Sequence, residues 1–269
     1  MHSQLSDQQI ADYRANGFLV VEELLSASEL EQWRDAVDSA IEQDLVKPPA
    51  DSGAGKARVF DQRMNLRRAS ETIKPLVEDR AIGKLVAQLE GIDAVRVYLD
   101  QALVKGPYGA PTQFHQDLPW WPFDSNHAAT IWIALDDATV QNGCLYFVPR
   151  TNHLELTHRS DLGSQLGAIF DDNPGITQAP VPGAIPAGGC TFHNARTIHG
   201  AGANMTPGRR RAMTVAFMPD GARFNGTRDL RALGADYLDT LALGDLLQND
   251  DLNPLVYARE GSSASVGSD

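Results

Sequence analysis

The sequence changes character after Gly91, and this change most constrains the fold. Beyond it, short apolar runs alternate with turn residues, a pattern that is typical of β-strands. Asn142-Gly143 lies between two of these runs and predicts a tight turn, since both residues tolerate a positive φ. Helical segments followed by many strands favour an α+β protein, mainly β, built on an antiparallel sandwich or barrel. Strands are expected at residues 95–104, 130–135, 144–148, 190–193 and 212–218.

Helix signals flank this β-rich region. Ser6 with Gln9, and Ser26 with Glu29, have the spacing at which an N-cap residue and the third helical residue satisfy each other's backbone amides. Each pair therefore predicts the start of a helix. Further elements are expected as a strand at 18–21 and as helices at 73–89 and 230–247.

Composition and charge narrow the functional classes. The chain has 269 residues, 42% of them hydrophobic, so it can bury a substantial core. Its net charge of −12 has the wrong sign for binding nucleic-acid phosphates or an anionic membrane. No signal peptide and no run of eighteen apolar residues is found, which favours a cytoplasmic protein. We expect one domain over residues 1–260 and a flexible tail at 261–269.

His115 and Asp117 give the first indication of chemistry. In an extended segment, residues two apart project from the same face, so this imidazole and this carboxylate point together. His199 follows 82 residues after Asp117, at a strand end from which it can close on the pair. Two histidines and one carboxylate on one face of a metal form the triad that suits Fe(II) and leaves positions open. A His-x-Asp pair alone is common, so the surrounding residues must decide.

Arg210 lies 11 residues after His199, at the start of an expected strand. Alternation places Arg210, Ala212 and Thr214 on one face of that strand, so the guanidinium faces the barrel interior. Its planar fork fits a carboxylate with two hydrogen bonds. From these residues alone, an ion pair with one of the many Asp and Glu side chains remains an equal alternative.

Four stretches of the sequence share their order and spacing with a known family. They are FHQDL at 114–118 with WWP at 120–122, WIALDD at 132–137, QNGCL at 141–145 leading to VP at 148–149, and HGAGAN at 199–204 leading to RRRA at 209–212. With the opening segment YRANGFLV at 13–20, the chain resembles the phytanoyl-CoA dioxygenase-like branch of the Fe(II)- and 2-oxoglutarate-dependent oxygenases. The resemblance covers most of residues 5–225.

The resemblance implies a double-stranded β-helix, a jelly-roll or cupin-like barrel with helices packed on one side. By residue match, His115, Asp117 and His199 would bind Fe(II), Arg210 would hold the distal carboxylate of 2-oxoglutarate, and Trp132 would pack beside this cosubstrate. With O₂, the family's chemistry converts 2-oxoglutarate to succinate and CO₂ while a substrate carbon is oxidised. Further candidates for the cosubstrate pocket are Gln116, Tyr98, Lys105 and Thr214.

One departure and one agreement refine this expectation. Ala201 stands where some relatives have a hydroxyl that helps to hold the cosubstrate, and Thr206 and Thr214 are candidate substitutes. Asp117 agrees with the oxygenase pattern, whereas halogenating relatives have a small residue at that position. We therefore expect oxygen insertion rather than halogenation.

Other residues near the motifs have more ordinary interpretations as well. Trp120, Trp121 and Phe123 follow the His-x-Asp segment and either line the substrate pocket or cap the core at the barrel mouth. His193, six residues before His199, is interpreted as a structural histidine of its strand.

The leading hypothesis is a dioxygenase that hydroxylates, or otherwise oxidises, a small organic metabolite or natural-product intermediate. An acyl-CoA hydroxylase is the alternative within the family, but the net negative charge disfavours it. Outside the family, the alternatives are a non-catalytic barrel that binds a metal or small ligand, and a zinc hydrolase with the same triad. Asp117 and Arg210 favour the oxygenase. We expect no nucleic-acid or membrane partner, and the sequence does not indicate the oligomeric state.

Overall fold

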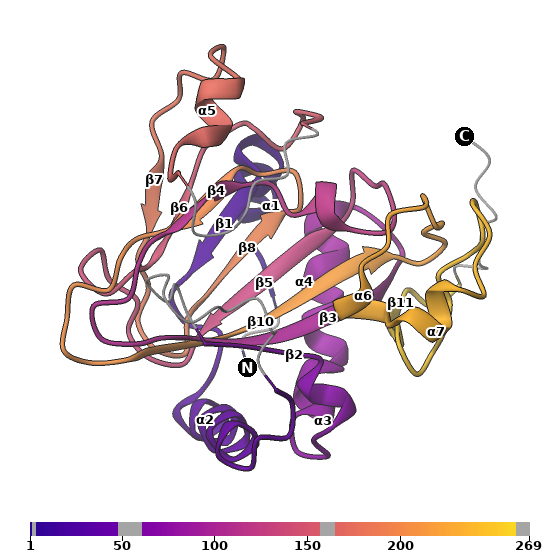
Figure 1. Cartoon of the computed structure of the whole chain (residues 1–269), viewed down its shortest axis with the longest axis horizontal. Coiled ribbons are helices and arrows are strands. Elements are labelled where there is room, and N and C mark those ends of the chain that lie inside the picture. The colour runs from indigo at the N-terminus through magenta and orange to yellow at the C-terminus, as the bar shows by residue number, and fades with distance from the viewer. Residues whose placement is uncertain (2–3, 48–60, 157–164, 262–269) are drawn as a thin grey trace.

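Two antiparallel sheets, with helices against one of them, form the body of the molecule (Figure 1). The computed structural model describes residues 1, 4–47, 61–156 and 165–261. The larger sheet has the strand order β1-β8-β5-β10-β3-β11, with β2 also paired to β3, and the smaller sheet has the order β4-β9-β6-β7. The strands are β1 (Phe18–Val21), β2 (Asp61–Met64), β3 (Ala94–Lys105), β4 (Thr112–His115), β5 (Ala129–Ala134), β6 (Leu145–Phe147), β7 (Val181–Gly183), β8 (Cys190–Asn194), β9 (His199–Ala201), β10 (Arg210–Pro219) and β11 (Leu255–Ala258). The predicted α+β, mainly β architecture is therefore confirmed.

The first two helices begin where the sequence predicts. Ser6 and Ser26 each accept a hydrogen bond from the third helical residue, and both complete a capping box. The helices are α1 (Asp7–Asn16), α2 (Ala27–Glu42), α3 (Lys74–Val77), α4 (Arg80–Glu90), α5 (Ala168–Asp172), α6 (Leu230–Leu233) and α7 (Ala235–Leu238), with 3₁₀ turns η1 (Leu66–Arg68) and η2 (Leu118–Trp120). Among the described residues, none of these helices has the length and apolar character needed to cross a bilayer.

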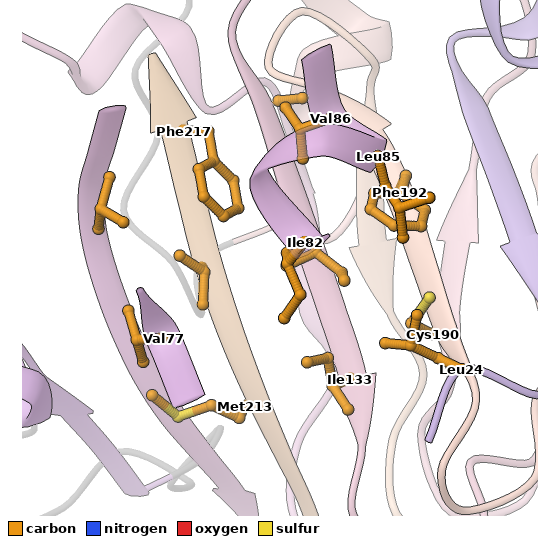
Figure 2. Packing of buried hydrophobic residues seen from close by; sticks show 14 of the residues in the cluster. Leu24, Val77, Ile82, Leu85, Val86, Ile133, Cys190, Phe192, Met213 and Phe217 are labelled. Carbon is orange, nitrogen blue, oxygen red and sulfur yellow. The ribbon is translucent and has the colours of Figure 1, made fainter. Parts of the chain in front are cut away.

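The main core lies between the helices and the outer face of the larger sheet (Figure 2). Helix α4 contributes Ile82, Leu85 and Val86, which recur at helical spacing and therefore share one face. They pack above Phe217 of β10 and Phe192 of β8. Burying side chains of this kind stabilises the fold by about 1.5–3 kcal/mol each, so this layer fixes the larger sheet on which the site residues stand.

Strand β10 separates the two faces of the larger sheet by alternation. Met213, Val215 and Phe217 belong to the core beneath the helices. Ala212 instead packs in a second cluster with Trp132, between the two sheets. The predicted orientation of β10 is thus confirmed, and the face that carries Arg210, Ala212 and Thr214 is the one turned toward the barrel interior.

Both ends of the chain join the larger sheet, because β1 pairs with β8 and β11 pairs with β3. One domain over residues 1–260 stays a prediction. Residues 262–269 of the expected tail lie outside the described residues.

Two predicted helices are wrong in extent. The expected helix at 73–89 is divided, because Asp79 adopts an extended conformation and caps a new helix, α4. The expected helix at 230–247 is reduced to the two single turns α6 and α7, because Gly234 between them has a positive φ. Strand β6 begins at Leu145, so Cys144 lies between the preceding turn and the strand.

Candidate active site

His115, Asp117 and His199 lie together where β4 and β9 pair, with His115 directly opposite His199 in the ladder. One ligand atom from each residue lies within 4.8 Å of the other two. The Asp117 Oδ1 atom lies 3.5 Å from His115 Nε2 and 3.7 Å from His199 Nε2. Two imidazole nitrogens and one carboxylate oxygen thus converge as the sequence predicts, and this donor set fits a non-haem Fe(II) site.

Backbone carbonyls set the tautomer of both triad histidines. His115 Nδ1 lies 2.9 Å from the Gln113 carbonyl oxygen, and His199 Nδ1 lies 3.0 Å from the Thr197 carbonyl oxygen. A carbonyl oxygen can only accept, so each Nδ1 must donate its proton. The lone pair of each Nε2 is then directed at the space beside Asp117, which is the orientation that a metal ligand needs.

The charge state of the triad suits a cation. Burial alone raises the pKa of Asp117, but the nearby imidazoles of His199, His115 and His193 outweigh it and hold that pKa well below its usual range. Burial lowers the pKa of His199, and the other two imidazoles lower it further. A carboxylate anion and a neutral imidazole are the forms that bind a divalent metal.

Arg210 extends from β10 into the interior, as predicted. Its side chain is 2% exposed, and its guanidinium lies 5.0 Å from the ring centroid of Trp132. Nε and Nη1 of Arg210 have no hydrogen-bond partner among the described residues. Burial lowers the pKa of this guanidinium to about 10. The alternative of an ion pair with a nearby Asp or Glu is not supported, because no such pair occurs within the described chain.

Lys105 adds a second buried cation opposite Arg210. The two residues are direct partners in the β3–β10 ladder, and Lys105 is fully buried. Its Nζ donates to the Ala110 carbonyl oxygen at 2.6 Å. Burial, and secondarily the charge of Arg210, lowers the pKa of Lys105 to about 7. The buried guanidinium and the adjacent amine have no carboxylate partner among the described residues, which indicates a site that an anion would complete.

Other interior residues carry hydrogen-bonding atoms without partners. Trp132 Nε1, Thr191 Oγ1 and both ring nitrogens of His193 are buried and have no partner among the described residues. Thr191 is paired with Trp132 across β8 and β5, and His193 is paired with Thr130 in the same ladder. These atoms and those of Arg210 gather on the interior face of the larger sheet, which favours a polar ligand between the sheets.

The structure corrects the prediction that Gln116 lines the cosubstrate pocket. Its side-chain amide donates to the carbonyl oxygens of Leu154 and Arg196, and its Oε1 accepts from the Leu156 amide. Alternation explains this, because a residue between His115 and Asp117 points to the opposite side of the segment. The Gln116 side chain therefore links two loops by hydrogen bonds and does not face the cosubstrate pocket.

The predicted substitutes for the hydroxyl missing at Ala201 differ in position. Thr214 stands on the interior face opposite Trp132, with its hydroxyl 3.4 Å from the Gln101 carbonyl oxygen. Thr206 lies in the β9–β10 loop, where its hydroxyl donates to Asn204 Oδ1 at 2.7 Å. Thr214 stays a candidate for the cosubstrate pocket, whereas the Thr206 hydroxyl stabilises the loop between β9 and β10.

The aromatic residues after the triad segment belong mainly to the core. Phe123 is fully buried and Trp121 is 6% exposed. Both pack against Tyr98, whose hydroxyl donates to Asp229 Oδ2 at 2.7 Å. This packing favours the core-capping interpretation for Trp121 and Phe123 and makes Tyr98 part of the same cluster. Trp120 is only partly buried, and contact of these aromatic residues with a substrate stays a prediction.

Thr130 and Thr191 are not predicted from the sequence, and His193 is predicted there only as a structural histidine. His193 does lie in a strand, but its Nε2 is 3.4 Å from Asp117 Oδ2. Alternation along β8 was the available signal, because Thr191 and His193 share the face opposite to the buried Cys190 and Phe192.

Comparison with solved structures defines the class of protein. The non-heme alpha ketoglutarate dependent carbocyclase SnoK from nogalamycin biosynthesis aligns with a TM-score of 0.79 and 28% identity, over 94% of this chain and 96% of that chain. The epimerase SnoN, in complex with Fe3+, alpha ketoglutarate and nogalamycin RO, aligns with a TM-score of 0.76 and 29% identity, over 93% and 98%. The fold is therefore the predicted double-stranded β-helix, and the class is that of the iron- and 2-oxoglutarate-dependent oxygenases.

Sequence comparison gives the family. The family described as "Phytanoyl-CoA dioxygenase (PhyH)" matches residues 13–212. A probable alpha-ketoglutarate-dependent hypophosphite dioxygenase of Stutzerimonas stutzeri is 26% identical over 226 residues, which cover 78% of this chain and 77% of the relative. The peroxisomal phytanoyl-CoA dioxygenase of Mus musculus is 25% identical over 232 residues, which cover 79% and 68%. The chain belongs to the phytanoyl-CoA dioxygenase family of Fe(II)- and 2-oxoglutarate-dependent oxygenases.

Proposed function

We propose that this protein uses Fe(II), 2-oxoglutarate and O₂ to hydroxylate, or otherwise oxidise, a carbon of a small organic metabolite or natural-product intermediate. The observation that carries the proposal is the buried, unpaired guanidinium of Arg210 on the same interior face as the residues around the triad. A buried cation without a partner is costly, so its retention indicates an anionic ligand.

The donor set fits both iron and the cosubstrate. His115, Asp117 and His199 would hold Fe(II), because their nitrogen and oxygen donors match the preference of this metal and leave positions for other ligands. Arg210 would bind the distal carboxylate of 2-oxoglutarate through its two free N–H groups, with Lys105 as a neighbouring positive charge. Trp132 would lie beside the chain of this dicarboxylate.

Iron and 2-oxoglutarate together supply the oxidation, in which R–H, 2-oxoglutarate and O₂ give R–OH, succinate and CO₂. The protein's own residues orient and shield these reactants. Carbonyl oxygens accept from Nδ1 of His115 and His199 and so orient each ring with its Nε2 toward the metal position. Asp117 occupies the position that a small residue would leave to a halide, so oxygenation rather than halogenation is expected, and a chlorinated product in chloride buffer would contradict this.

A small substrate suits the exposure and charge of the site. The side chains of His115, Asp117 and His199 are 12%, 20% and 7% exposed, so the triad is recessed but reachable from outside. The similarity to enzymes of nogalamycin biosynthesis supports a natural-product intermediate, and the net charge of −12 disfavours a polyanionic acyl-CoA. The mouse relative keeps an acyl-CoA hydroxylase as the alternative.

An anaerobic titration tests the proposal. The apo protein is titrated first with Fe(II) and then with 2-oxoglutarate, and absorbance is followed for the visible charge-transfer band of chelated iron. The band should appear in the wild type, and substrates can then be screened by succinate release. Bound iron without a band would instead favour the non-catalytic or hydrolytic alternatives.

A further inference from the structure

His193 is a buried histidine beside the triad that the proposed function leaves without a role. Its side chain is 2% exposed, and its ring centroid lies 4.2 Å from that of His199. Phe147 packs against both rings and is itself stacked on Phe18, so the position of His193 is closely defined. Neither ring nitrogen has a hydrogen-bond partner among the described residues. An imidazole buried in this way needs a reason, since burial of unpaired polar atoms costs free energy.

The carboxylate of Asp117 divides its two oxygens between two sets of neighbours. Oδ1 faces the triad, at 3.5 Å from His115 Nε2 and 3.7 Å from His199 Nε2. Oδ2 faces the larger sheet, where the Thr130 hydroxyl donates to it at 3.1 Å and His193 Nε2 lies at 3.4 Å. Thr130 and His193 are direct partners in the β5–β8 ladder. One row of the larger sheet therefore places a hydroxyl donor and an imidazole nitrogen beside the same oxygen.

We propose that His193 and Thr130 are positioning residues that hold Oδ2 of Asp117 and so restrict this carboxylate to coordination through Oδ1 alone. The proposal rests on the metal site of the proposed function. A carboxylate without partners can rotate and bind a metal through both oxygens, which occupies an additional position. The hydrogen bond from Thr130 and the neighbouring Nε2 of His193 oppose that rotation, which would leave three metal positions for 2-oxoglutarate and O₂.

The geometry distinguishes this role from that of a fourth metal ligand. The atoms that cluster within 4.8 Å of one another come from His115, Asp117 and His199, and all of them lie on the Oδ1 side. His193 approaches the opposite oxygen. A side chain that replaces His193 and donates a hydrogen bond should therefore preserve the role of His193, even when that side chain does not bind metal as an imidazole does.

Paired variants at each position test the proposal. His193→Gln keeps an N–H donor near the place of Nε2, whereas His193→Phe keeps a ring without a donor. Thr130→Ser and Thr130→Val make the same comparison for the hydroxyl. His153→Gln is the matched control, since His153 is exposed. The measurements are anaerobic Fe(II) affinity by competition with a chelating dye and the Co(II) absorption spectrum, which reports coordination number and geometry.

We expect His193→Phe to weaken Fe(II) binding by about 10- to 100-fold and to alter the Co(II) spectrum, as found for partners that orient metal ligands. His193→Gln, Thr130→Ser and His153→Gln should stay within about threefold of the wild type. The double variant His193→Phe/Thr130→Val should lose less than the product of the two single losses, because both residues act on one oxygen.

Two results would overturn the proposal. One is Fe(II) affinity and a Co(II) spectrum unchanged in both His193→Phe and Thr130→Val. The other is a loss in His193→Gln as large as in His193→Phe, which would indicate packing or direct ligation. If thermal unfolding reveals that His193→Phe does not fold, the Thr130 pair and His193→Gln decide. A wild type that binds no Fe(II) would refute the proposed function and this inference together, whereas a wild type with the 2-oxoglutarate band and insensitive variants would refute this inference alone.

Discussion

Replacement of Arg210 by methionine should stabilise the apo protein while it removes cosubstrate binding. Burial lowers the pKa of Arg210 from 12.5 to about 10, and one pKa unit corresponds to about 1.4 kcal/mol. Keeping this side chain charged at neutral pH therefore costs roughly 3 kcal/mol. Methionine has a similar length and no charge, but it loses the contact of the guanidinium with Trp132, a contact of about 0.5–2 kcal/mol. We expect a net gain of about 1–2.5 kcal/mol in the free energy of unfolding.

The effect on 2-oxoglutarate should have the opposite sign. The free N–H groups of Arg210 are buried, so a carboxylate bound to them is shielded from solvent. Loss of one partner from such a charged pair costs about 2–5 kcal/mol, which corresponds to a roughly 30-fold to several thousandfold weaker affinity. Fe(II) binding should be unaffected, because the triad does not include this residue.

Thermal unfolding with and without 2-oxoglutarate measures both effects. At 2–4 °C per kcal/mol, the apo Arg210→Met variant should melt roughly 2–10 °C above the wild type, and 2-oxoglutarate should no longer raise its Tm. Arg211→Met is the matched control, because Arg211 points outward and forms ion pairs with Asp136 and Asp38. This control should lose stability and keep its response to 2-oxoglutarate. The reasoning is refuted if Arg210→Met is no more stable than the wild type and still responds to 2-oxoglutarate.

Three further predictions concern the triad, a buried lysine and the helical layer. His115→Ala or Asp117→Ala should weaken Fe(II) binding by more than about 100-fold in a dye competition, and binding within threefold of the wild type would contradict the ligand set. Burial, and secondarily the charge of Arg210, lowers the pKa of Lys105 from 10.5 to about 7. Between pH 7 and pH 10.5, Lys105 is therefore protonated in the unfolded chain and deprotonated in the folded chain. The apo protein should therefore gain stability from pH 7 to pH 9.5 in urea unfolding, and Lys105→Met should lack this contribution. Tyr13→Phe removes a hydroxyl that donates to the buried Glu90 and should cost about 1–3 kcal/mol in urea unfolding without a change in Fe(II) affinity, whereas unchanged stability would contradict it.

The elements that sequence patterns predicted well are the long strands and the capped helices. Strand β10 alternates smaller and larger residues from Ala212 to Phe217, so its two faces are evident from the sequence. The short strands β2 and β9 have four and three residues, too few for such a pattern to be recognised. The segment 230–247 failed for another reason, since Gly234 interrupts an otherwise helical pattern.

The sequence by itself determined the triad and the arginine that faces the barrel interior. His115 and Asp117 are two residues apart, and Arg210 begins an alternating strand, so local geometry and the family motifs were enough to predict where their side chains point. Only the tertiary structure placed Thr130 and His193 at the outer oxygen of Asp117. Their meeting depends on the register between β5 and β8, which lie about sixty residues apart in the chain. Such a register is set by packing of both sheet faces, and no local pattern encodes it.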